Sequence, residues 1–374
     1  MKITALEPIP ILVPLKQGLT TKTAHGEHID SPYVLLRVHT DEGIVGVGEA
    51  TLAPRWSGET SPGCVAVLRD VLAPAILGAD PRNVRDIARR VSKAIRHNPF
   101  AKATVEMACW DIAGKAADVP VYRLLGGRVR DVAPMKMVVG AFDVPRASAL
   151  AQRFLDWGVR HLKVKVGLDV GQDIERVQAV RDLAGPDVSI GVDGNCGWDV
   201  ATAKRGLRAF EQLNVTFAEQ PVGTDDPRSL AAVRAATSIP VMADESVFTP
   251  QDAVSLIRHD AADIFAVYPG KNAGILGSLA IADIAAAAGL TCSIGSNLEL
   301  GVATAAMLHL AIACPGIDSE RYPGDLLGPL YHEADMITEP LQLGPEVATV
   351  PEGPGLGVTL DEEQIERFRD PSQS

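Results

Sequence analysis

The chain has 374 residues, of which 47% are hydrophobic and 22% charged, as expected for a soluble enzyme with two domains or one barrel with an appendage. Its formal net charge of −12 disfavours nucleic acid and anionic membrane surfaces as partners. The five cysteines form no CxxC pair, and we find neither a signal peptide nor an apolar run of about 18 residues. These features predict a cytoplasmic protein with reduced thiols.

The first third of the chain predicts an α+β domain spanning residues 1–128. Apolar runs on either side of the turn at Asp41–Gly43 indicate an antiparallel hairpin. Two polar loops, at about 16–30 and 51–62, remain available for contacts outside this domain. Three windows with helical spacing follow the hairpin, at 63–78, 82–95 and 100–117.

From about residue 133 onwards, short apolar runs alternate with helical windows. This alternation predicts a parallel sheet closed as a (β/α)₈ barrel over residues 129–335. Residues 336–374, which contain Pro- and Gly-rich turns and one short helix, should return to pack on the N-terminal domain. The expected strands are 134–140, 161–166, 188–193, 215–218, 239–243, 263–268, 291–294 and 316–318.

Three acids, Asp193, Glu219 and Asp244, close successive apolar runs at nearly equal intervals. The intervals are 219 − 193 = 26 and 244 − 219 = 25 residues, the length of one strand, one helix and two loops. Such a repeat brings the acids to the same end of three neighbouring strands. A single acid there would be interpreted as a helix cap or an ion-pair partner. Three hard oxygen ligands in register instead predict a site for Mg²⁺ or Mn²⁺.

Three lysines are candidates for acid–base chemistry beside this site. Lys163 and Lys165 alternate with apolar residues on the second strand, so their side chains share one face. Their mutual repulsion and a nearby cation are expected to lower a lysine pKa towards the range of a general base. Lys271 follows the sixth strand and is expected to face them across the barrel mouth. Two solvated lysines at a strand end are the structural alternative.

Other polar residues are expected around the same mouth. Asn195 and Glu245 adjoin the acids and are expected to support them. Glu299, after the seventh strand, is a candidate for hydrogen bonding to substrate or to a lysine, with a purely structural role as the alternative. No zinc-protease, serine-hydrolase, P-loop or dinucleotide motif follows a strand. The capping loops supply three candidate substrate contacts, namely Lys22, Arg55 and Trp56.

Taken together, these motifs resemble the enolase superfamily, and within it the muconate cycloisomerase (muconate lactonizing enzyme) subgroup. The resemblance covers nearly the whole chain. It implies a modified enolase-type barrel whose N-terminal α+β capping domain is completed by the C-terminal tail. The motifs are Lys163-Val-Lys165, Val192-Asp-Gly-Asn195, Ala218-Glu-Gln-Pro221, Ala243-Asp-Glu-Ser246, Lys271-Asn-Ala-Gly274, Asn297-Leu-Glu299, Leu326-Leu-Gly-Pro-Leu330 and Gly353-Pro-Gly-Leu-Gly357.

The resemblance also implies a chemistry. The three acids would bind Mg²⁺ or Mn²⁺, which holds a substrate carboxylate and stabilises the enediolate formed when the α-proton leaves. Lys165 would be the acid/base on one face, tuned by Lys163. Lys271 would serve the other face as acid/base or as a cation, and Glu299 matches a family glutamate. The expected function is a muconate-type cycloisomerase; the alternative is a racemase, epimerase or dehydratase of a small carboxylate such as an amino-acid derivative. A homo-oligomer is also expected.

The chain departs from the subgroup at three places. Val267-Tyr-Pro-Gly precedes Lys271 where the subgroup usually has Lys-Ile, and the usual Gly-Gly is Ala273-Gly274. The eighth-strand region lacks the Asp-x-Asp of dipeptide epimerases. No histidine follows the seventh strand, which argues against mandelate racemases and sugar-acid dehydratases. Two hypotheses from other classes remain, a Schiff-base aldolase and a non-catalytic barrel.

Overall fold

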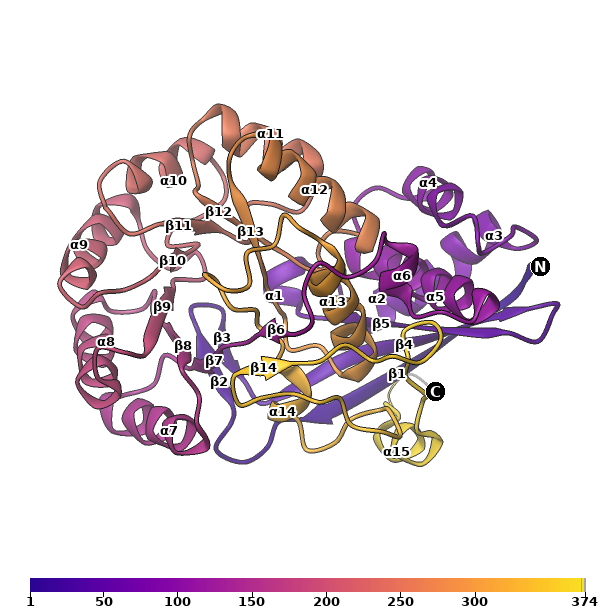
Figure 1. Cartoon of the computed structure of the whole chain (residues 1–374), viewed down its shortest axis with the longest axis horizontal. Helices are drawn as coiled ribbons and strands as arrows, with labels where there is room; N and C mark the ends of the chain where they lie inside the picture. Colours follow the sequence, from indigo (N-terminus) through magenta and orange to yellow (C-terminus); the bar gives the residue numbers. More distant parts are fainter. Residues whose placement is uncertain (371, 373–374) are drawn as a thin grey trace.

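The computed structural model describes residues 1–370 and 372. Its N-terminal part contains an antiparallel sheet of β1 (Ile3–Pro14), β4 (Asp30–Thr40) and β5 (Val45–Thr51), in the order β1-β4-β5. The expected hairpin is therefore present as β4 and β5. The first polar loop instead contains a second small hairpin, made of β2 (Thr21–Thr23) and β3 (Gly26–His28), which reaches towards the barrel (Figure 1).

Helices cover one side of this sheet, and the longest lies directly on β5. Two glycines of β5 permit that close approach, because a Cβ on Gly46 or Gly48 would lie 2.2 or 2.0 Å from a backbone oxygen of the helix. The first expected helical window is present as three consecutive helical segments, of which the middle one is π-helical. The helices are α1 (Pro54–Ser57), α2 (Ser61–Ala66), η1 (Val67–Leu72), α3 (Ala73–Ile76), α4 (Val84–Ala94), α5 (Pro99–Ala117) and α6 (Val121–Leu124).

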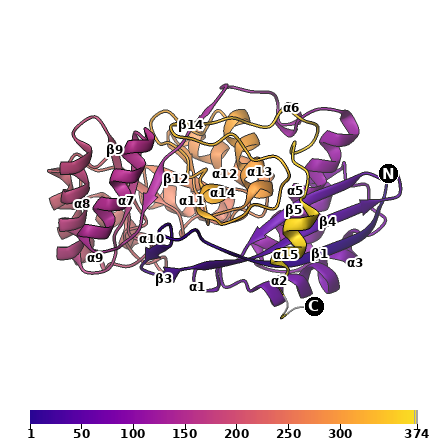
Figure 2. The same cartoon turned by 90° about the horizontal axis from the view of Figure 1, so that it is seen from below.

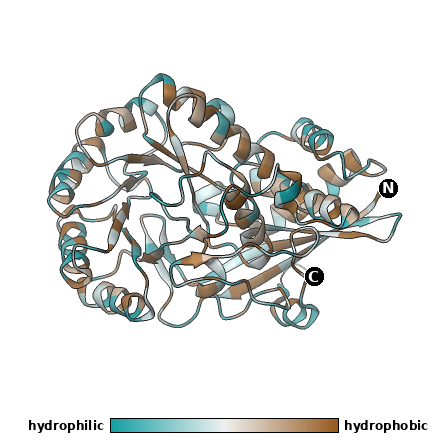
Figure 3. Cartoon of the chain, in the orientation of Figure 1, coloured by the Kyte–Doolittle hydropathy of each residue, from teal (hydrophilic) through white to brown (hydrophobic). Residues whose placement is uncertain are grey.

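The second part is a curled parallel sheet with its helices on the outside (Figure 1). Hydrophobic residues concentrate on the strands and on the parts of the helices that face them (Figure 3). The sheet runs β7 (Met137–Val139), β8 (His161–Lys165), β9 (Ser189–Asp193), β10 (Ala218–Glu219), β11 (Val241–Ala243), β12 (Ile264–Val267) and β13 (Thr291–Ile294). The helices are α7 (Val144–Trp157), α8 (Val170–Ala184), α9 (Val200–Glu211), α10 (Pro227–Arg234), α11 (Pro250–Arg258), α12 (Ile275–Ala287) and α13 (Gly301–Ala313).

The prediction of an eighth strand at 316–318 is wrong. The segment after α13 makes only single parallel bridges, Cys292 to Ile317 and Met135 to Gly324. Pro315 and Pro323 lie in this segment, and proline cannot donate to a strand ladder. The barrel is therefore a modified one, with seven paired strands and an irregular eighth segment.

The C-terminal tail runs back along the molecule to the N-terminal sheet. It contains α14 (Gly328–Tyr331), β14 (Val347–Ala348) and α15 (Glu362–Phe368), and β14 pairs with β6 (Ala133–Pro134). Arg369 bridges to Ile11 of β1, and Arg37 of β4 donates to Glu362 at 2.6 Å. Figure 2 shows α15 beside β1 and β4. Within residues 1–370 and 372, no helix is both long and apolar enough to cross a bilayer.

Buried carboxylates connect the capping part to the barrel helices. Glu106 of α5 accepts from the backbone nitrogens of Ile275 and Leu276, at the start of α12, at 2.9 Å each. Glu49 of β5 likewise accepts from Leu300 and Ala303, at the start of α13. These N–H groups have no partner within their own helices, and they attract negative charge. Burial raises the pKa of Glu106 to about 7 and that of Glu49 to about 8.

We predict that Glu106→Ala lowers the free energy of unfolding by roughly 2 kcal/mol or more, because two buried N–H groups lose their acceptor. Glu106→Gln keeps an acceptor oxygen and should lose clearly less. Urea denaturation measures both values. Equal losses in the two variants would show that the loss of a hydrogen-bond acceptor is not the cause of the destabilisation.

Candidate active site

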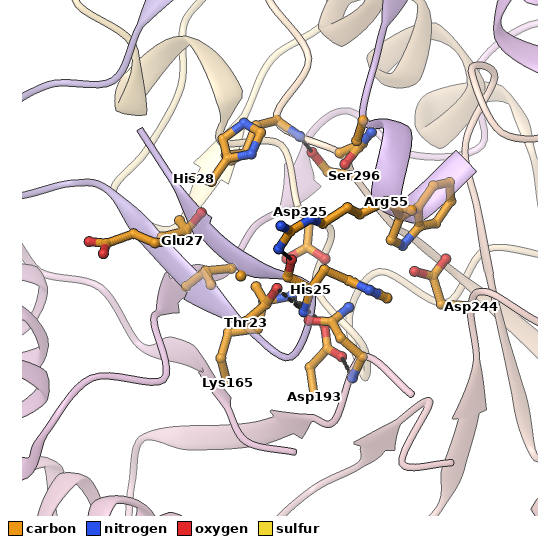
Figure 4. A pocket seen from close by; sticks show the side chains of 18 of the residues that line it. Thr23, His25, Glu27, His28, Arg55, Lys165, Asp193, Asp244, Ser296 and Asp325 are labelled. Atoms are coloured by element: carbon orange, nitrogen blue, oxygen red, sulfur yellow. Dashed lines mark hydrogen bonds and ion pairs between the residues drawn. The ribbon is translucent and has the colours of Figure 1, made fainter. Parts of the chain in front are cut away.

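A cavity of about 480 Å³ lies between the carboxyl ends of the barrel strands and the capping segments. Its volume falls in the range of small-molecule sites. The small β2–β3 hairpin and the segment 52–56 form one side, and strand ends form the other (Figure 4). The barrel contributes a cluster of charged and polar residues to the lining, namely Lys163, Lys165, Asp193, Asn195, Glu219, Asp244 and Asp325.

The three predicted acids lie on neighbouring strands. Asp193 ends β9 and is paired in register with Glu219, which ends β10, while Asp244 follows β11 directly. All three are at least 95% buried and all line the cavity, since their exposed fractions are 1%, 2% and 5%. The equal spacing in the sequence thus corresponds to one charged edge of the sheet.

Lys163 connects these acids to a fourth. Its Nζ lies 2.6 Å from Asp325 Oδ2, 3.0 Å from Glu219 Oε2 and 3.4 Å from Asp193 Oδ2. Burial lowers the pKa of Lys163, but the three carboxylates outweigh burial and hold the pKa well above its usual range. Among the protein groups alone, the carboxylates around Lys163 thus outweigh the repulsion expected from its neighbouring lysine.

Burial and neighbouring charges shift the pKa values of the three acids. Burial, reinforced by the charge of Asp193, raises the pKa of Glu219 to about 8. Burial also raises the pKa of Asp244 to about 6, although Lys271 opposes it. Burial acts the same way on Asp193, but Lys165 and Lys163 outweigh it and lower that pKa. Burial and mutual repulsion thus disfavour the charged forms of Glu219 and Asp244, and a cation bound among the acids would favour them.

The donor set at this edge fits a divalent cation. Within residues 1–370 and 372, no three His, Cys, Asp or Glu side chains are gathered as a complete metal cluster. Lysine ammonium groups lie against the acids instead; the Nζ of Lys271, for example, is 2.5 Å from Asp244 Oδ1. The three acids nonetheless supply hard carboxylate oxygens from one sheet edge, as Mg²⁺ and Mn²⁺ require.

Lys165 lies at the cavity wall within a short hydrogen-bonded chain. Its Nζ donates to Asp193 Oδ2 at 2.6 Å and to Asn195 Oδ1 at 2.9 Å. The Nδ2 of Asn195 donates to Glu245 Oε1 at 3.0 Å, and that oxygen lies 3.3 Å from Nε2 of His25 in the β2–β3 turn. Asn195 and Glu245 therefore hold Lys165 in place, and His25 connects the hairpin to them.

Lys271 has a different environment. Its side chain is fully buried, and it does not line the cavity. Its Nζ donates to Asp244 Oδ1 at 2.5 Å, to Asp244 O at 2.9 Å and to Ala266 O at 2.8 Å. It also lies 5.1 Å from the ring centre of Tyr268. Because an ammonium group has three N–H donors, all of those of Lys271 are used.

Two of the candidate site residues, Glu299 and Lys22, are not among the residues that line the cavity. Glu299 contacts no lysine; it is buried, accepts from Ser296 Oγ at 2.5 Å and from the backbone of Asn297, and does not line the cavity. It therefore stabilises its own turn, and burial raises its pKa to about 7. The side chain of Lys22 is exposed; its backbone pairs with Glu27 in the β2–β3 hairpin and accepts from the nitrogen of Ala141. Local sequence could not show which way either side chain points.

The capping loop after β5 supplies the other two candidate substrate contacts. Arg55 and Trp56 both line the cavity, and the Trp56 ring lies 5.2 Å from that of Phe248. Aromatic contacts of this kind fix the loop over the barrel mouth.

Sequence reasoning missed Asp325 and Lys136. Asp325 is buried between the two lysines Lys163 and Lys136, with Lys136 Nζ 3.3 Å from its Oδ1. Lys136 is 1% exposed, and its Nζ also donates to Pro323 O at 2.6 Å. The 25–26-residue repeat does not lead to this acid, because Asp325 follows Asp244 by 325 − 244 = 81 residues. No local signal marks Lys136.

We predict that Asp325→Asn lowers the free energy of unfolding by about 3–5 kcal/mol, because it leaves the Lys136 charge buried without a carboxylate. Adding Lys136→Met removes that charge and should restore part of the loss. Urea denaturation of the wild type, both single variants and the double variant gives the coupling energy. Additive losses would mean that the two residues do not act as a pair.

Comparisons with known proteins agree with this geometry. Residues 7–126 match the family model of the mandelate racemase / muconate lactonizing enzyme N-terminal domain, and residues 146–364 match that of the enolase C-terminal domain-like family.

Individual relatives cover nearly the whole chain. An N-succinyl-L-Arg/Lys racemase of Bacillus cereus is 33% identical, with 98% of each chain covered, and its crystal structure aligns with a TM-score of 0.94. A chloromuconate cycloisomerase of Cupriavidus pinatubonensis is 35% identical, with 90% of each covered. A dipeptide epimerase of Cytophaga hutchinsonii, solved with Mg and a dipeptide, is 29% identical with 99% of each covered and a TM-score of 0.93. The chain therefore belongs to the enolase superfamily, in its muconate lactonizing enzyme-like subgroup, and is an enzyme of that superfamily.

Proposed function

We propose that the protein is a metal-dependent cycloisomerase of the muconate type, in which one lysine transfers a proton at the carbon α to a carboxylate. The observation that carries this proposal is the contrast between Lys165 and Lys271. Lys165 lines the cavity and uses two of its three N–H donors, so that one remains for a substrate atom. Lys271 uses all three and lies outside the cavity lining. This arrangement favours proton transfer on a single face.

The remaining residues have separate tasks. Asp193, Glu219 and Asp244 would hold Mg²⁺ or Mn²⁺, which when bound supplies Lewis-acid stabilisation of the charge that develops on the substrate carboxylate. Lys163, kept charged by its carboxylates, fixes the acids in position. Lys165 delivers the proton to the α-carbon after the second carboxylate of a muconate adds across its double bond. Lys271 acts as a fixed buried cation.

A racemase or epimerase is the second candidate. The N-succinyl-L-Arg/Lys racemase of Bacillus cereus, which matches over 98% of both chains, favours it. Such a reaction needs an acid/base on each face, so Lys271 would have to leave its three acceptors and reach the cavity. None of the relatives named above is an aldolase, and the Schiff-base hypothesis gains no support from them.

We predict that the protein, with Mg²⁺ in D₂O, converts cis,cis-muconate to a lactone that carries one solvent deuterium. Lys165→Ala should reduce the rate by about 10²–10⁴-fold, the usual contribution of a general acid. Mass spectrometry follows the deuterium, and chiral chromatography of N-succinyl-L-lysine incubated in parallel detects racemisation. Racemisation that disappears in Lys271→Met would contradict the one-face proposal and establish the second candidate.

We also predict that Mg²⁺ stabilises the fold, independently of any turnover. At about 100 times its Kd, a ligand that binds only the native state adds about 2.7 kcal/mol to the free energy of unfolding. Glu219→Gln should lose most of this stabilisation, whereas Glu299→Gln, a buried acid outside the cavity lining, should retain it. Thermal denaturation with and without Mg²⁺ measures the shift. An unchanged response in Glu219→Gln would remove that residue from the metal site.

A further inference from the structure

The end of β8, which carries Lys165, is held from outside the cavity by two buried residues of α8. The ladder between β8 and β9 ends at the pair of Lys165 and Asp193. Beyond this pair, the carbonyl oxygen of Lys165 accepts from Nη1 of Arg176 at 3.1 Å. Nε of the same guanidinium donates to the carbonyl oxygen of Phe142, in the segment that follows β7. Arg176 thus connects the ends of two neighbouring strands through one side chain.

Asp173 fixes both Arg176 and the turn that follows β8. Its Oδ1 lies 2.5 Å from Nη1 of Arg176, and its Oδ2 accepts from the backbone nitrogens of Gly167 and Leu168 at 3.0 Å each. Asp173 and Arg176 are 0% and 2% exposed, and neither lines the cavity. Displacing either side chain would leave a buried charge and buried backbone groups without partners, so this contact holds its geometry tightly.

The same turn lies against the residues that accept from Lys165. Gly167 has a φ of +97°, and a Cβ there would lie 2.1 Å from the carbonyl oxygen of Gly194. Gly194 stands between Asp193 and Asn195 in the sequence. The side chains of these two residues accept from Nζ of Lys165 at 2.6 and 2.9 Å. The position of the turn after β8 therefore sets the distance between Lys165 and its two acceptors.

We propose that Arg176, held by Asp173, is a positioning residue for Lys165. By fixing the backbone at the end of β8, it keeps Nζ on its two acceptors and leaves one N–H donor for a substrate in the cavity. This inference rests on the proposed function, which assigns proton transfer to Lys165. A displacement of about 1 Å in a reacting group can cost about 10²-fold in rate, so a backbone contact outside the cavity can act on the chemical step.

Arg181, on the same helix, provides a matched control. Its guanidinium also donates to backbone carbonyl oxygens, at 2.7 Å to those of Gly185 and Val188. Val188 directly precedes β9, at the opposite end of that strand from Asp193. Replacing either arginine with methionine therefore removes a guanidinium that holds backbone oxygens, but only Arg176 acts at the end of the sheet that lines the cavity.

The reactivity of Lys165 is the first measurement, made on Arg176→Met, Arg176→Lys and Arg181→Met in Mg²⁺ buffer. Trace acetylation with acetic anhydride, followed by peptide mass spectrometry, compares Lys165 with Lys115 of the capping part. Arg176→Met should raise this ratio by about fivefold or more, the factor expected for the loss of one hydrogen bond. Arg176→Lys keeps the charge but loses the planar fork and should give an intermediate ratio. Arg181→Met should leave the ratio within about twofold.

The rate of muconate lactonisation in saturating Mg²⁺ is the second measurement. Arg176→Met should lower kcat by about 10–100-fold and change KM by less than about threefold, because Arg176 does not touch the substrate. Arg181→Met should keep kcat within about twofold. If the wild type does not lactonise muconate, the proposed function fails, and the acetylation ratio alone decides the role of Arg176.

Unchanged acetylation of Lys165 in Arg176→Met would overturn the proposal. Equal losses of kcat in Arg176→Met and Arg181→Met would also overturn it, since general destabilisation would then be the cause. A higher acetylation ratio with an unchanged kcat would support the positioning role and count against the proposed function, because Lys165 would not take part in the reaction. Far-UV circular dichroism and the melting temperature verify folding, and Arg176→Lys replaces Arg176→Met if the latter does not fold.

Discussion

The ammonium group of Lys163 is the contact on which the active-site end of the barrel depends. It lies against carboxylates from β9, from β10 and from the segment that follows α13, at 3.4, 3.0 and 2.6 Å. Buried acids at neighbouring strand ends repel one another, and burial disfavours their charged forms. The positive charge of Lys163 offsets both the repulsion between the acids and the cost of burying their charged forms. The irregular eighth segment is held in place by the same contact, through Asp325, and by Lys136 on its other side.

Buried carboxylates also stabilise the interface between the capping part and the barrel. Glu49 and Glu106 give buried carboxylates to the N-termini of α13 and α12, where backbone N–H groups need acceptors. These contacts position β5 and α5, and therefore the α1 loop that follows β5. The cavity is closed on one side by this loop and by the β2–β3 hairpin, whose His25 reaches Glu245 on the barrel. Residues of the capping part and of the barrel thus line one cavity.

The proposed chemistry follows from how ammonium donors are distributed. Lys165 has a donor left for substrate, and Lys271 has none. In the proposed cycloisomerase, a single protonation at the α-carbon is all that Lys165 has to supply.

The sequence alone determined the superfamily, the alternation of strands and helices, and the position of Asp193, Glu219 and Asp244 on one sheet edge. These follow from local periodicity and from a spacing of 25 or 26 residues, which any closed βα repeat converts into proximity. Only the tertiary structure decided the direction of individual side chains. In the folded chain, Glu299 and Lys22 do not line the cavity, and Lys271 is buried against Asp244. Lys136 lies beside Asp325, which is 325 − 136 = 189 residues away in the sequence. Long-range ion pairs and the irregular eighth segment depend on contacts between distant parts of the chain, which no local pattern encodes.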